Sequence, residues 1–224
     1  MSFDVQVFAS DAYPLAVARR IADRMPSSGS LVLTGGTTAA RVYECLADFA
    51  PEHLTELDIL FSDERCVPPD DPESNYLMAR TLLLEPLGAE NVHRMRGEDP
   101  PEEAAAAYHS EIAPIVERGL DLLLLGMGAD AHVGAMFPGS PVVEETESFC
   151  AAVDRPDGMR GLTLTPPAML RTRRALLLVT GEAKAATVAR VLAGAEPASE
   201  CPARILAPHP DVTFLLDTEA ASAL

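Results

Sequence analysis

The sequence contains no uninterrupted apolar segment of the roughly 18 residues that a membrane-spanning helix requires. Its first ten residues, MSFDVQVFAS, also lack the basic segment with which a secretory signal begins. These two absences predict a protein that neither crosses a membrane nor is exported, and the cytoplasm is its expected location.

Cysteine and histidine are both scarce. Four cysteines, Cys45, Cys66, Cys150 and Cys201, are scattered along the chain without a C-x-x-C pair. This spacing argues against a disulfide framework and fits a reducing compartment. The five histidines show neither H-x-x-x-H nor H-E-x-x-H spacing, so no dedicated metal site is expected.

Basic residues are few: 17 Lys and Arg stand against 34 Asp and Glu, which gives a formal net charge of −17. Nucleic acids and anionic membranes both attract positive surfaces, so neither is an expected partner. Only one basic residue, Lys184, is a lysine. Composition alone does not say whether this lysine reflects a preference for arginine or a specific role.

Apolar residues make up 48% of the 224-residue chain, which is enough for a substantial core. Apolar runs alternate with segments of helical periodicity, and runs such as LDLLLLG (120–126) suit strands buried on both faces. The alternation predicts a doubly wound α/β fold, a mostly parallel sheet sandwiched by helices in a Rossmann-like three-layer arrangement. No repeat or linker divides the chain, so residues 1–224 are expected to form a single domain.

The expected strands are 3–8, 30–34, 57–62, 120–125, 148–153, 161–165, 174–179 and 212–216. The expected helices are 11–25, 38–49, 73–85, 101–118, 182–193 and 217–223. In a doubly wound sheet, ligands bind at the carboxyl ends of the strands. Four polar segments follow such ends: TGGTT (34–38), SDERCVP (62–68), GMGADAH (126–132) and TGEAK (180–184).

The segment GMGADAH formally matches the dinucleotide-binding pattern G-x-G-x-x-G/A. Its context disagrees, because Pro138 and Gly139 would stop a helix after about two turns, whereas that pattern opens a full helix. A catalytic interpretation makes His132 a general base whose tautomer Asp130 fixes. The structural alternative makes Asp130 a helix cap and His132 a partly buried spectator.

Two other segments suit an anion. In TGGTT, Gly35 and Gly36 precede a helix whose first N–H groups, with Thr37 and Thr38, would form an anion-binding nest. Lys184 lies in the first turn of another expected helix, where a cation opposes the helix dipole unless an anion is held between them. The alternative for the two threonines is ordinary helix capping.

The segment SDERCVP places Arg65 at a further strand end, where its guanidinium offers a planar fork to a carboxylate, a phosphate or an oxyanion. The alternative is a surface ion-pair cluster with Asp63 and Glu64. Cys66 suggests a thiol nucleophile paired with His132, but nothing in the sequence places the two together.

Together these segments resemble one family, the 6-phosphogluconolactonases that are related to glucosamine-6-phosphate deaminases. The resemblance runs almost end to end, through LVLTGGTTAARVYECLA, SDERCVPPDDPESNYLMARTLL, LLLLGMGADAHVGAMFPGSP, LTLTPPAMLRTRRALLLVTGEAKAATV and PARIL. The combination of DERxVP, SN, GxGxDxH with FPG, and VTGxxK is highly specific, unlike any single motif. The resemblance implies hydrolysis of the sugar phosphate lactone 6-phospho-D-glucono-1,5-lactone in the oxidative pentose phosphate pathway, without a cofactor.

The resemblance also implies roles for individual residues. His132 matches the family's general base, and Asp130 matches the carboxylate that orients it. Lys184 matches the phosphate-binding lysine, and Arg65 matches an arginine near the lactone or the phosphate. The other matches are the phosphate-binding turn Gly35, Gly36, Thr37 and Thr38, with Thr37 in place of the usual serine, and Asn75 of the SN pair in a supporting role.

The chain departs from the family pattern beside the base. Where the family usually reads GxDGHTASLFP, this chain has Ala131, Val133, Gly134 and Ala135. The change keeps the histidine and the aspartate but removes two hydroxyl groups, which alters what can position the base.

A second departure lies at Gly161, where the family commonly has a phosphate-binding arginine. The nearest arginine is Arg160, and a one-residue shift in a regular strand turns a side chain to the opposite face. A β-bulge at Gly161 would let Arg160 reach the phosphate, and this is the expectation. Otherwise Arg160 faces solvent, and Arg155 or Arg65 carries the charge.

Two other functions stay open at the level of sequence. One is an amino-sugar-phosphate isomerase or deaminase on the same fold, and the other is a sugar-phosphate sensor that binds without turnover. The segments SDERCVP and AMFPGS fit the lactonase branch better, and the presence of Asp130 and His132 favours turnover. A monomer or a weak homodimer is expected.

Overall fold

The computed structural model describes residues 3–49 and 54–224. Its strands are β1 (Asp4–Phe8), β2 (Gly29–Leu33), β3 (Leu57–Phe61), β4 (Asp63–Arg65), β5 (Leu120–Gly126), β6 (Cys150–Asp154), β7 (Arg160–Leu164), β8 (Thr172–Val179) and β9 (Val212–Asp217). Its longer helices are α1 (Tyr13–Ala22), α2 (Thr37–Ala47), α5 (Pro101–Arg118) and α7 (Ala185–Ala193). The shorter helical segments are η1 (Leu54–Glu56), α3 (Asn75–Ala79), η2 (Arg80–Leu84), α4 (Glu85–Leu87), η3 (Pro141–Glu144), α6 (Pro166–Met169), η4 (Glu182–Lys184) and η5 (Pro202–Leu206).

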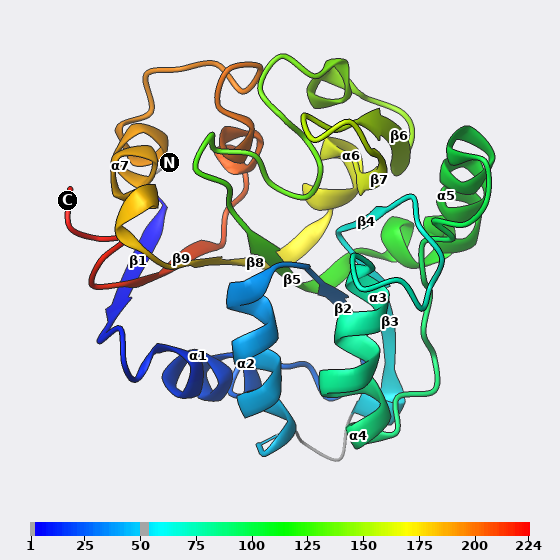
Figure 1. Ribbon diagram of the computed structural model, residues 1–224, viewed down its shortest axis with the longest axis horizontal. Coiled ribbons are helices and arrows are strands. Elements are labelled where there is room, and N and C mark those ends of the chain that lie inside the picture. Colours follow the sequence, from blue (N-terminus) through cyan, green and yellow to red (C-terminus); the bar gives the residue numbers. More distant parts are fainter. Residues whose placement is uncertain (1–2, 50–53) are drawn as a thin grey trace.

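Six strands form a parallel sheet in the order β1-β9-β8-β5-β2-β3 (Figure 1). From β2 the chain proceeds to β3 on one side, whereas from β5 it proceeds to β8 on the other. The loops that follow β2 and β5 therefore diverge and leave a crevice at the carboxyl ends of these two strands. Parallel α/β sheets bind their ligands at such switch points.

The central strand β5 shows why the sequence has continuous apolar runs. Leu123 and Leu125 belong to one core cluster, and Leu122 and Leu124 belong to the other, each at most 1% exposed. Buried residues of α5 and α7 pack in the first cluster, and those of α1 and α2 pack in the second (Figure 1). A sheet covered on both faces needs apolar side chains at successive positions, so the predicted three-layer α/β fold is confirmed.

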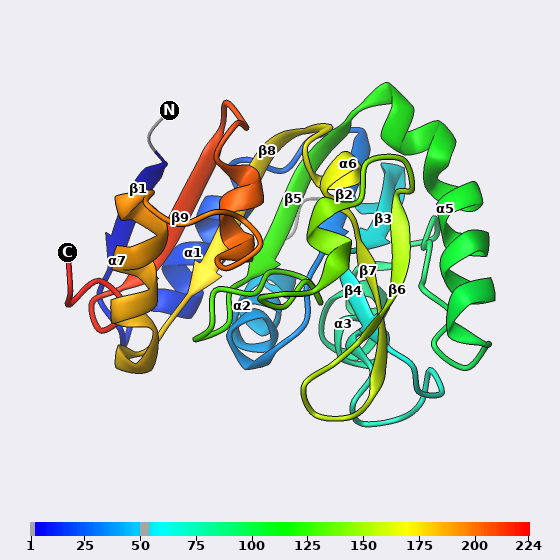
Figure 2. The same ribbon diagram turned by 90° about the horizontal axis from the view of Figure 1, so that it is seen from above.

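The strands β4, β7 and β6 form a separate antiparallel sheet in that order. It lies beside the β3 end of the large sheet, and α5 packs against β6 and β7 (Figure 2). Two backbone hydrogen bonds through Ser62 join the sheets, from its N–H to Leu33 O at 2.7 Å and from Leu164 N–H to its carbonyl at 2.8 Å. The sequence predicted strands at 148–153 and 161–165, but it did not predict their separate sheet or the short strand β4.

Two predicted helices differ from the structure. Residues 217–223 form no helix, because Asp217 ends β9 and its carboxylate accepts the Ala220 N–H at 2.7 Å in a turn. The predicted helix 73–85 is interrupted by η2, a π-helical turn that comes just before Pro86, which has no N–H to continue the α-helical ladder. Among the described residues, no helix is long and apolar enough to cross a membrane.

Candidate active site

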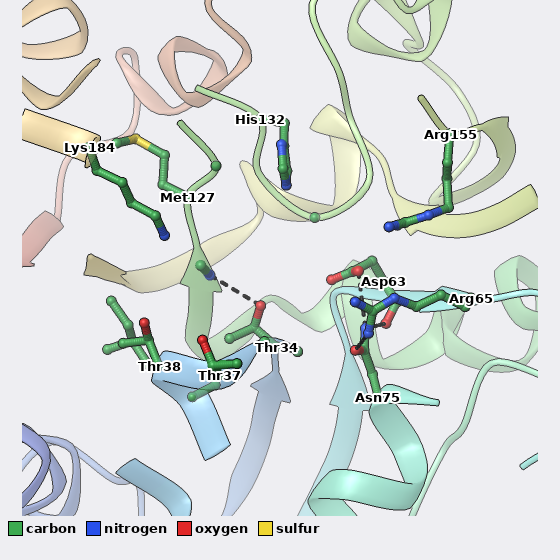
Figure 3. Close-up of a pocket in the computed structure, with 17 residues that line it drawn as sticks. Thr34, Thr37, Thr38, Asp63, Arg65, Asn75, Met127, His132, Arg155 and Lys184 are labelled. Carbon is green, nitrogen blue, oxygen red and sulfur yellow. Dashed lines mark hydrogen bonds between the residues drawn. The ribbon is translucent and has the colours of Figure 1, made fainter. Parts of the chain in front are cut away.

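A pocket of about 230 Å³ lies in the crevice between the carboxyl ends of β2 and β5 (Figure 3). Loops that follow β2, β5 and β8 form one wall, and β4, α3 and the β6–β7 hairpin contribute to the other. The lining residues are Thr34, Gly35, Gly36, Thr37, Thr38, Ala39, Asp63, Arg65, Asn75, Gly126, Met127, Gly128, His132, Gly134, Arg155, Leu178 and Lys184.

The glycine turn after β2 brings backbone N–H groups to this pocket. Gly36 has a φ of +95°, which glycine adopts without strain. Gly35 has no room for a side chain, because a Cβ there would lie 1.9 Å from Asn75 Oδ1. The helix α2 then begins at Thr37 without a side-chain cap, so its first N–H groups are available at the pocket wall. Capping by Thr37 or Thr38, the alternative interpretation, is wrong.

Lys184 lies on the same side of the pocket as Thr37 and Thr38 (Figure 3). The Oγ1 atoms of Thr38 and Thr180 are 2.8 Å apart, which joins the start of α2 to the loop that leads to Lys184. Burial lowers the pKa of Lys184, and the nearby carboxylate of Asp217 partly opposes this. No carboxylate of the described residues forms an ion pair with Lys184, so its charge is available to an anion in the pocket.

The loop after β5 presents His132 to the pocket and Asp130 to His132. Asp130 Oδ1 lies 2.6 Å from His132 Nδ1 and also accepts the His132 N–H at 3.1 Å. The hydrogen bond from the ring lowers the pKa of Asp130. Gly128 leaves space for the ring, because a Cβ there would lie 2.2 Å from His132 Nδ1. The ring points into the pocket, and its Nε2 has no partner among the described residues (Figure 3).

Ala131 turns the chain between these two side chains. Its φ of +72° is the one left-handed value of a non-glycine residue in the described part of the chain. The left-handed conformation costs an alanine about 1–2 kcal/mol. Ala203 N–H donates to Ala131 O at 2.9 Å and helps to hold the turn. Residues 127–140 therefore form turns with no helix that Asp130 could cap, and the structural alternative for Asp130 is wrong.

Glu64 fixes β4 to the start of α3. Its carboxylate accepts the N–H groups of Arg65 (2.8 Å), Asn75 (2.7 Å) and Tyr76 (2.8 Å) and the Ser74 hydroxyl (3.0 Å). Burial raises the pKa of Glu64, and these four hydrogen bonds oppose the rise. The carboxylate thus satisfies N–H groups that a helix leaves free at its first turn. Glu64 supports the site and is no part of a surface ion-pair cluster.

Asn75 connects Asp63 to Arg65 at the pocket wall (Figure 3). Its Nδ2 donates to Asp63 O at 2.9 Å and to Asp63 Oδ2 at 3.1 Å, and its Oδ1 accepts from Arg65 Nη1. Arg65 also donates to Glu73 O at 3.1 Å but pairs with no carboxylate among the described residues. Cys66 does not line the pocket, and burial raises the pKa of its thiol, so a thiol nucleophile has no support.

The expectation for Arg160 is wrong. The strand β7 pairs regularly with β6, with Arg160 opposite Asp154, and no bulge occurs at Gly161. In this regular strand Arg160 turns away from the pocket. Outside the pocket, its Nη2 lies 2.5 Å from Glu102 Oε1 and its Nε lies 3.1 Å from Asp154 Oδ1. Arg155 lines the pocket instead, as the alternative interpretation required.

The structure brings most of the predicted residues together. His132, Lys184, Arg65 and the turn 35–38 line one pocket, and Asp130 acts on it through His132. The pocket also contains Thr34 and Met127, which lie in the predicted segments TGGTT and GMGADAH but had no role assigned from the sequence. Within residues 3–49 and 54–224, no three His, Cys, Asp or Glu side chains lie close enough together to hold a metal ion.

This α/β chain belongs to the family described as Glucosamine-6-phosphate isomerases/6-phosphogluconolactonase, whose model matches residues 9–215. Within the family, it is 36% identical to the 6-phosphogluconolactonase of Streptomyces coelicolor, over 96% of this chain and 90% of that protein. The family resemblance predicted from the sequence motifs is confirmed.

Solved structures agree with this assignment. The structure of 6-phosphogluconolactonase from Trypanosoma brucei is 29% identical and covers 99% of this chain and 98% of its own, with a TM-score of 0.86. A monomeric glucosamine-6-phosphate deaminase covers 99% of this chain and 100% of its own, with a TM-score of 0.87, but is only 23% identical. The likeness to the deaminase therefore shows the shared fold alone.

Proposed function

We propose that this protein hydrolyses 6-phospho-D-glucono-1,5-lactone to 6-phosphogluconate, the lactone-opening step of the oxidative pentose phosphate pathway. Membership of the family and the identity to a 6-phosphogluconolactonase support the proposal. The observation that carries it is the state of His132. Its Nδ1 is held by Asp130 at 2.6 Å, while Nε2 has no partner among the described residues.

Asp130 sets the protonation of the imidazole. Because the hydrogen bond from His132 lowers the pKa of Asp130, the carboxylate is ionised at neutral pH. An ionised carboxylate can only accept a hydrogen bond, so Nδ1 keeps its proton and donates to Asp130, and the lone pair of the neutral ring is on Nε2. A water molecule between Nε2 and the substrate carbonyl can lose its proton to Nε2 as it attacks.

In the reaction, the water oxygen forms a bond to C1 of the lactone, and His132 takes the proton. The tetrahedral intermediate then breaks the bond between C1 and the ring oxygen, and the imidazolium gives its proton to that oxygen. Water is thereby added across the ester, with no change of oxidation state. Asp130 stabilises the imidazolium between the two proton transfers.

The polar walls of the pocket would orient the substrate. Lys184 and the N-terminus of α2 suit the phosphate, because a charged amine and free N–H groups face the same space. Asp63 can accept hydrogen bonds from sugar hydroxyls, and Arg65 can donate to the carbonyl oxygen. A donor aimed at a developing oxyanion typically contributes ~3 kcal/mol to transition-state stabilisation. Binding at several points makes the attack effectively unimolecular.

The test is the hydrolysis of freshly prepared 6-phosphogluconolactone, measured against its spontaneous rate, with glucosamine 6-phosphate as a parallel substrate. We expect acceleration of lactone hydrolysis only. Turnover of glucosamine 6-phosphate alone would assign the protein to the isomerases and deaminases. Binding of 6-phosphogluconate without turnover of either substrate would make it a sensor.

The proposal includes a reducing compartment such as the cytoplasm, a single domain over residues 1–224, and a monomer or weak homodimer. All four cysteines are free thiols, which suits a reducing compartment. The pocket takes residues from both sheets of one chain, so a monomer suffices for the site. Sedimentation at several protein concentrations tests the oligomeric state.

A further inference from the structure

Arg155 lines the pocket but has no role in the reaction as proposed. It follows β6, and its side chain points into the pocket from the side opposite Lys184 (Figure 3). Only 12% of the Arg155 side chain is exposed. Nε and Nη2 donate to Asp157 Oδ2 at 3.1 and 2.9 Å, and Nη1 has no partner among the described residues. One edge of the guanidinium is therefore fixed, and Nη1 is free to bind an oxyanion.

Gly161 makes space for this arginine. A Cβ on Gly161 would lie 3.1 Å from Arg155 Cδ, 3.4 Å from Arg155 Cγ and 3.2 Å from Glu64 O. The φ of Gly161 is not in the left-handed region, so the backbone here does not require glycine. The fit is instead one of room, because a Cβ at position 161 would press on the stem of Arg155 and on Glu64 O, and a neighbour would have to shift by a few tenths of an ångström.

Phe137 holds Arg155 in a fixed relation to the base. Arg155 Cζ lies 5.6 Å from the centroid of the Phe137 ring, a distance at which cation and ring attract each other. The ring of His132 packs against the same side chain, with centroids 4.6 Å apart. Arg155 and His132 are thus positioned by one aromatic ring.

We propose that Arg155 binds an oxyanion of the substrate on the side of the pocket opposite Lys184, and that it requires Gly161 to do so. This inference rests on the proposed function. A guanidinium binds a phosphate and the carboxylate of a sugar acid by the same forked hydrogen bonding. A side chain that starts at position 161 would begin in tight contact with the stem of Arg155, with its Cβ 3.1 Å from Cδ and 3.4 Å from Cγ, and would run beside it. Arginine at either position would therefore follow the same path.

The test is calorimetric binding of 6-phosphogluconate to the wild type, Arg155→Ala and Arg160→Ala. Arg160 is the matched control. It stands at the other end of the loop that joins β6 to β7, but it forms ion pairs outside the pocket. We expect Arg155→Ala to weaken binding roughly tenfold or more and Arg160→Ala to change it less than about twofold. Unchanged affinity in Arg155→Ala would overturn the inference.

Simpler probes identify the bound group. If the oxyanion is the phosphate, Arg155→Ala weakens the binding of inorganic phosphate and leaves that of gluconate unchanged. If it is the carboxylate, the pattern is reversed. If the wild type binds none of the three ligands, 6-phosphogluconate, inorganic phosphate and gluconate, the inference is also overturned.

The role of Gly161 has its own test. Gly161→Ala should weaken 6-phosphogluconate binding in the wild type but add little to Arg155→Ala, since the arginine it displaces is already absent. The double variant Arg155→Ala/Gly161→Arg should recover affinity. Thermal unfolding of each variant checks that the fold is kept. Losses that simply add, with no recovery in the double variant, would overturn the requirement for Gly161.

Turnover distinguishes this inference from the proposed function. If the wild type does not accelerate lactone hydrolysis, but Arg155→Ala loses affinity for 6-phosphogluconate, only the proposed function is wrong. If the wild type hydrolyses the lactone, and Arg155→Ala keeps both its KM and its product affinity, only the inference is wrong.

Discussion

The pair of Asp130 and His132 depends on one hydrogen bond between side chains two residues apart. We expect Asp130→Asn to lower kcat roughly 100-fold or more, because an amide can stabilise the wrong tautomer of the imidazole. His132→Ala should lower kcat at least as much. Both variants should keep the affinity for 6-phosphogluconate, since neither side chain is needed to hold the product.

Steady-state kinetics and product binding check this prediction, with Asp99→Asn as a control at a surface ion pair with Arg96. The wild type should keep its His–Asp pair in mildly acidic solution, because the pKa of Asp130 is lowered and its carboxylate protonates only at more acidic pH. A His132→Ala variant with wild-type kcat would show that His132 is a spectator.

Lys184 should make phosphate binding sensitive to alkaline pH. Burial lowers the pKa of Lys184, so the amine loses its proton at a lower pH than an exposed lysine does. Because the charged amine attracts phosphate, 6-phosphogluconate affinity should fall as the pH rises through this lowered pKa. Binding in that range should be accompanied by proton uptake.

Calorimetry in buffers of different ionisation enthalpy measures both the affinity and the proton uptake. Lys184→Arg is the matched variant, because a guanidinium stays charged over the whole range. It should bind phosphate without the alkaline decline. The same decline in Lys184→Arg as in the wild type would assign the titration to another group.

At the scale of secondary-structure elements, Glu64 determines how the small sheet meets α3. Glu64→Gln keeps the size of the side chain but replaces one acceptor oxygen by an NH₂ group, which cannot accept the hydrogen bonds now made to it. We expect a loss of roughly 1–3 kcal/mol in the free energy of unfolding, the usual cost of a buried group left without its partner. The activity should fall as well, because Glu64 accepts the backbone N–H groups of Arg65 and Asn75 and so holds these two pocket residues in place.

Chemical denaturation and kcat/KM measure the two effects. Glu85→Gln is a suitable control, since Glu85 forms an exposed ion pair with Arg80. Equal stability of Glu64→Gln and the control would show that the four hydrogen bonds of Glu64 do not hold α3 in place.

Elements with strong local signals were predictable from the sequence, and their pairing was not. The run 120–126 is apolar at nearly every position, which indicates a strand buried on both faces wherever it lies in the sheet. The strand β4 has only three residues. Two of them are acidic, and their buried carboxylates are stabilised by hydrogen bonds, so the strand has no apolar periodicity. Antiparallel pairing of β6 with β7 depends on contacts between the two strands, and the periodicity of one segment does not indicate which strand it pairs with.

In the candidate site, too, the residues with local sequence signals were predictable and those placed by strand pairing were not. His132, Lys184 and the turn 35–38 were predictable together, because the carboxyl ends of parallel strands meet at one edge of a sheet. Arg155 reaches the pocket from the antiparallel sheet, and the only sequence signal for it was an unexpected glycine six residues later. The error at Arg160 came from assuming a distortion in a strand that is regular.

At the scale of the whole molecule, 34 acidic residues against 17 basic ones leave much of the negative charge unpaired. Self-repulsion destabilises the compact state, and salt screens it as the Debye length falls from about 30 Å at 0.01 M to about 8 Å at 0.15 M. We expect Tm to rise over this range of NaCl concentration. Surface ion pairs such as Arg190–Glu196 weaken in salt but contribute only about 0–1 kcal/mol each.

Differential scanning calorimetry at several NaCl concentrations measures this dependence, with sucrose at matched osmolality as an uncharged control. A Tm that falls with NaCl would show that local ion pairs outweigh the net repulsion.

The position of the only lysine limits how the substrate can damage the protein. A lactone is an activated ester, and an unprotonated amine attacks its carbonyl to form an amide, while the bond between C1 and the ring oxygen breaks and that oxygen takes a proton from the amine. A guanidinium stays protonated and does not react. Lys184 is the one side-chain amine of the chain, and it lines the pocket that is proposed to bind the lactone. Prolonged incubation with excess lactone should therefore add one acyl group to a side chain, on Lys184, with loss of phosphate binding. Intact-mass analysis should find no side-chain adduct in Lys184→Arg, and adducts elsewhere would contradict this. The rate at which the lactone inactivates the protein then depends on one amine, through the fraction of Lys184 that is unprotonated and not in contact with a bound phosphate.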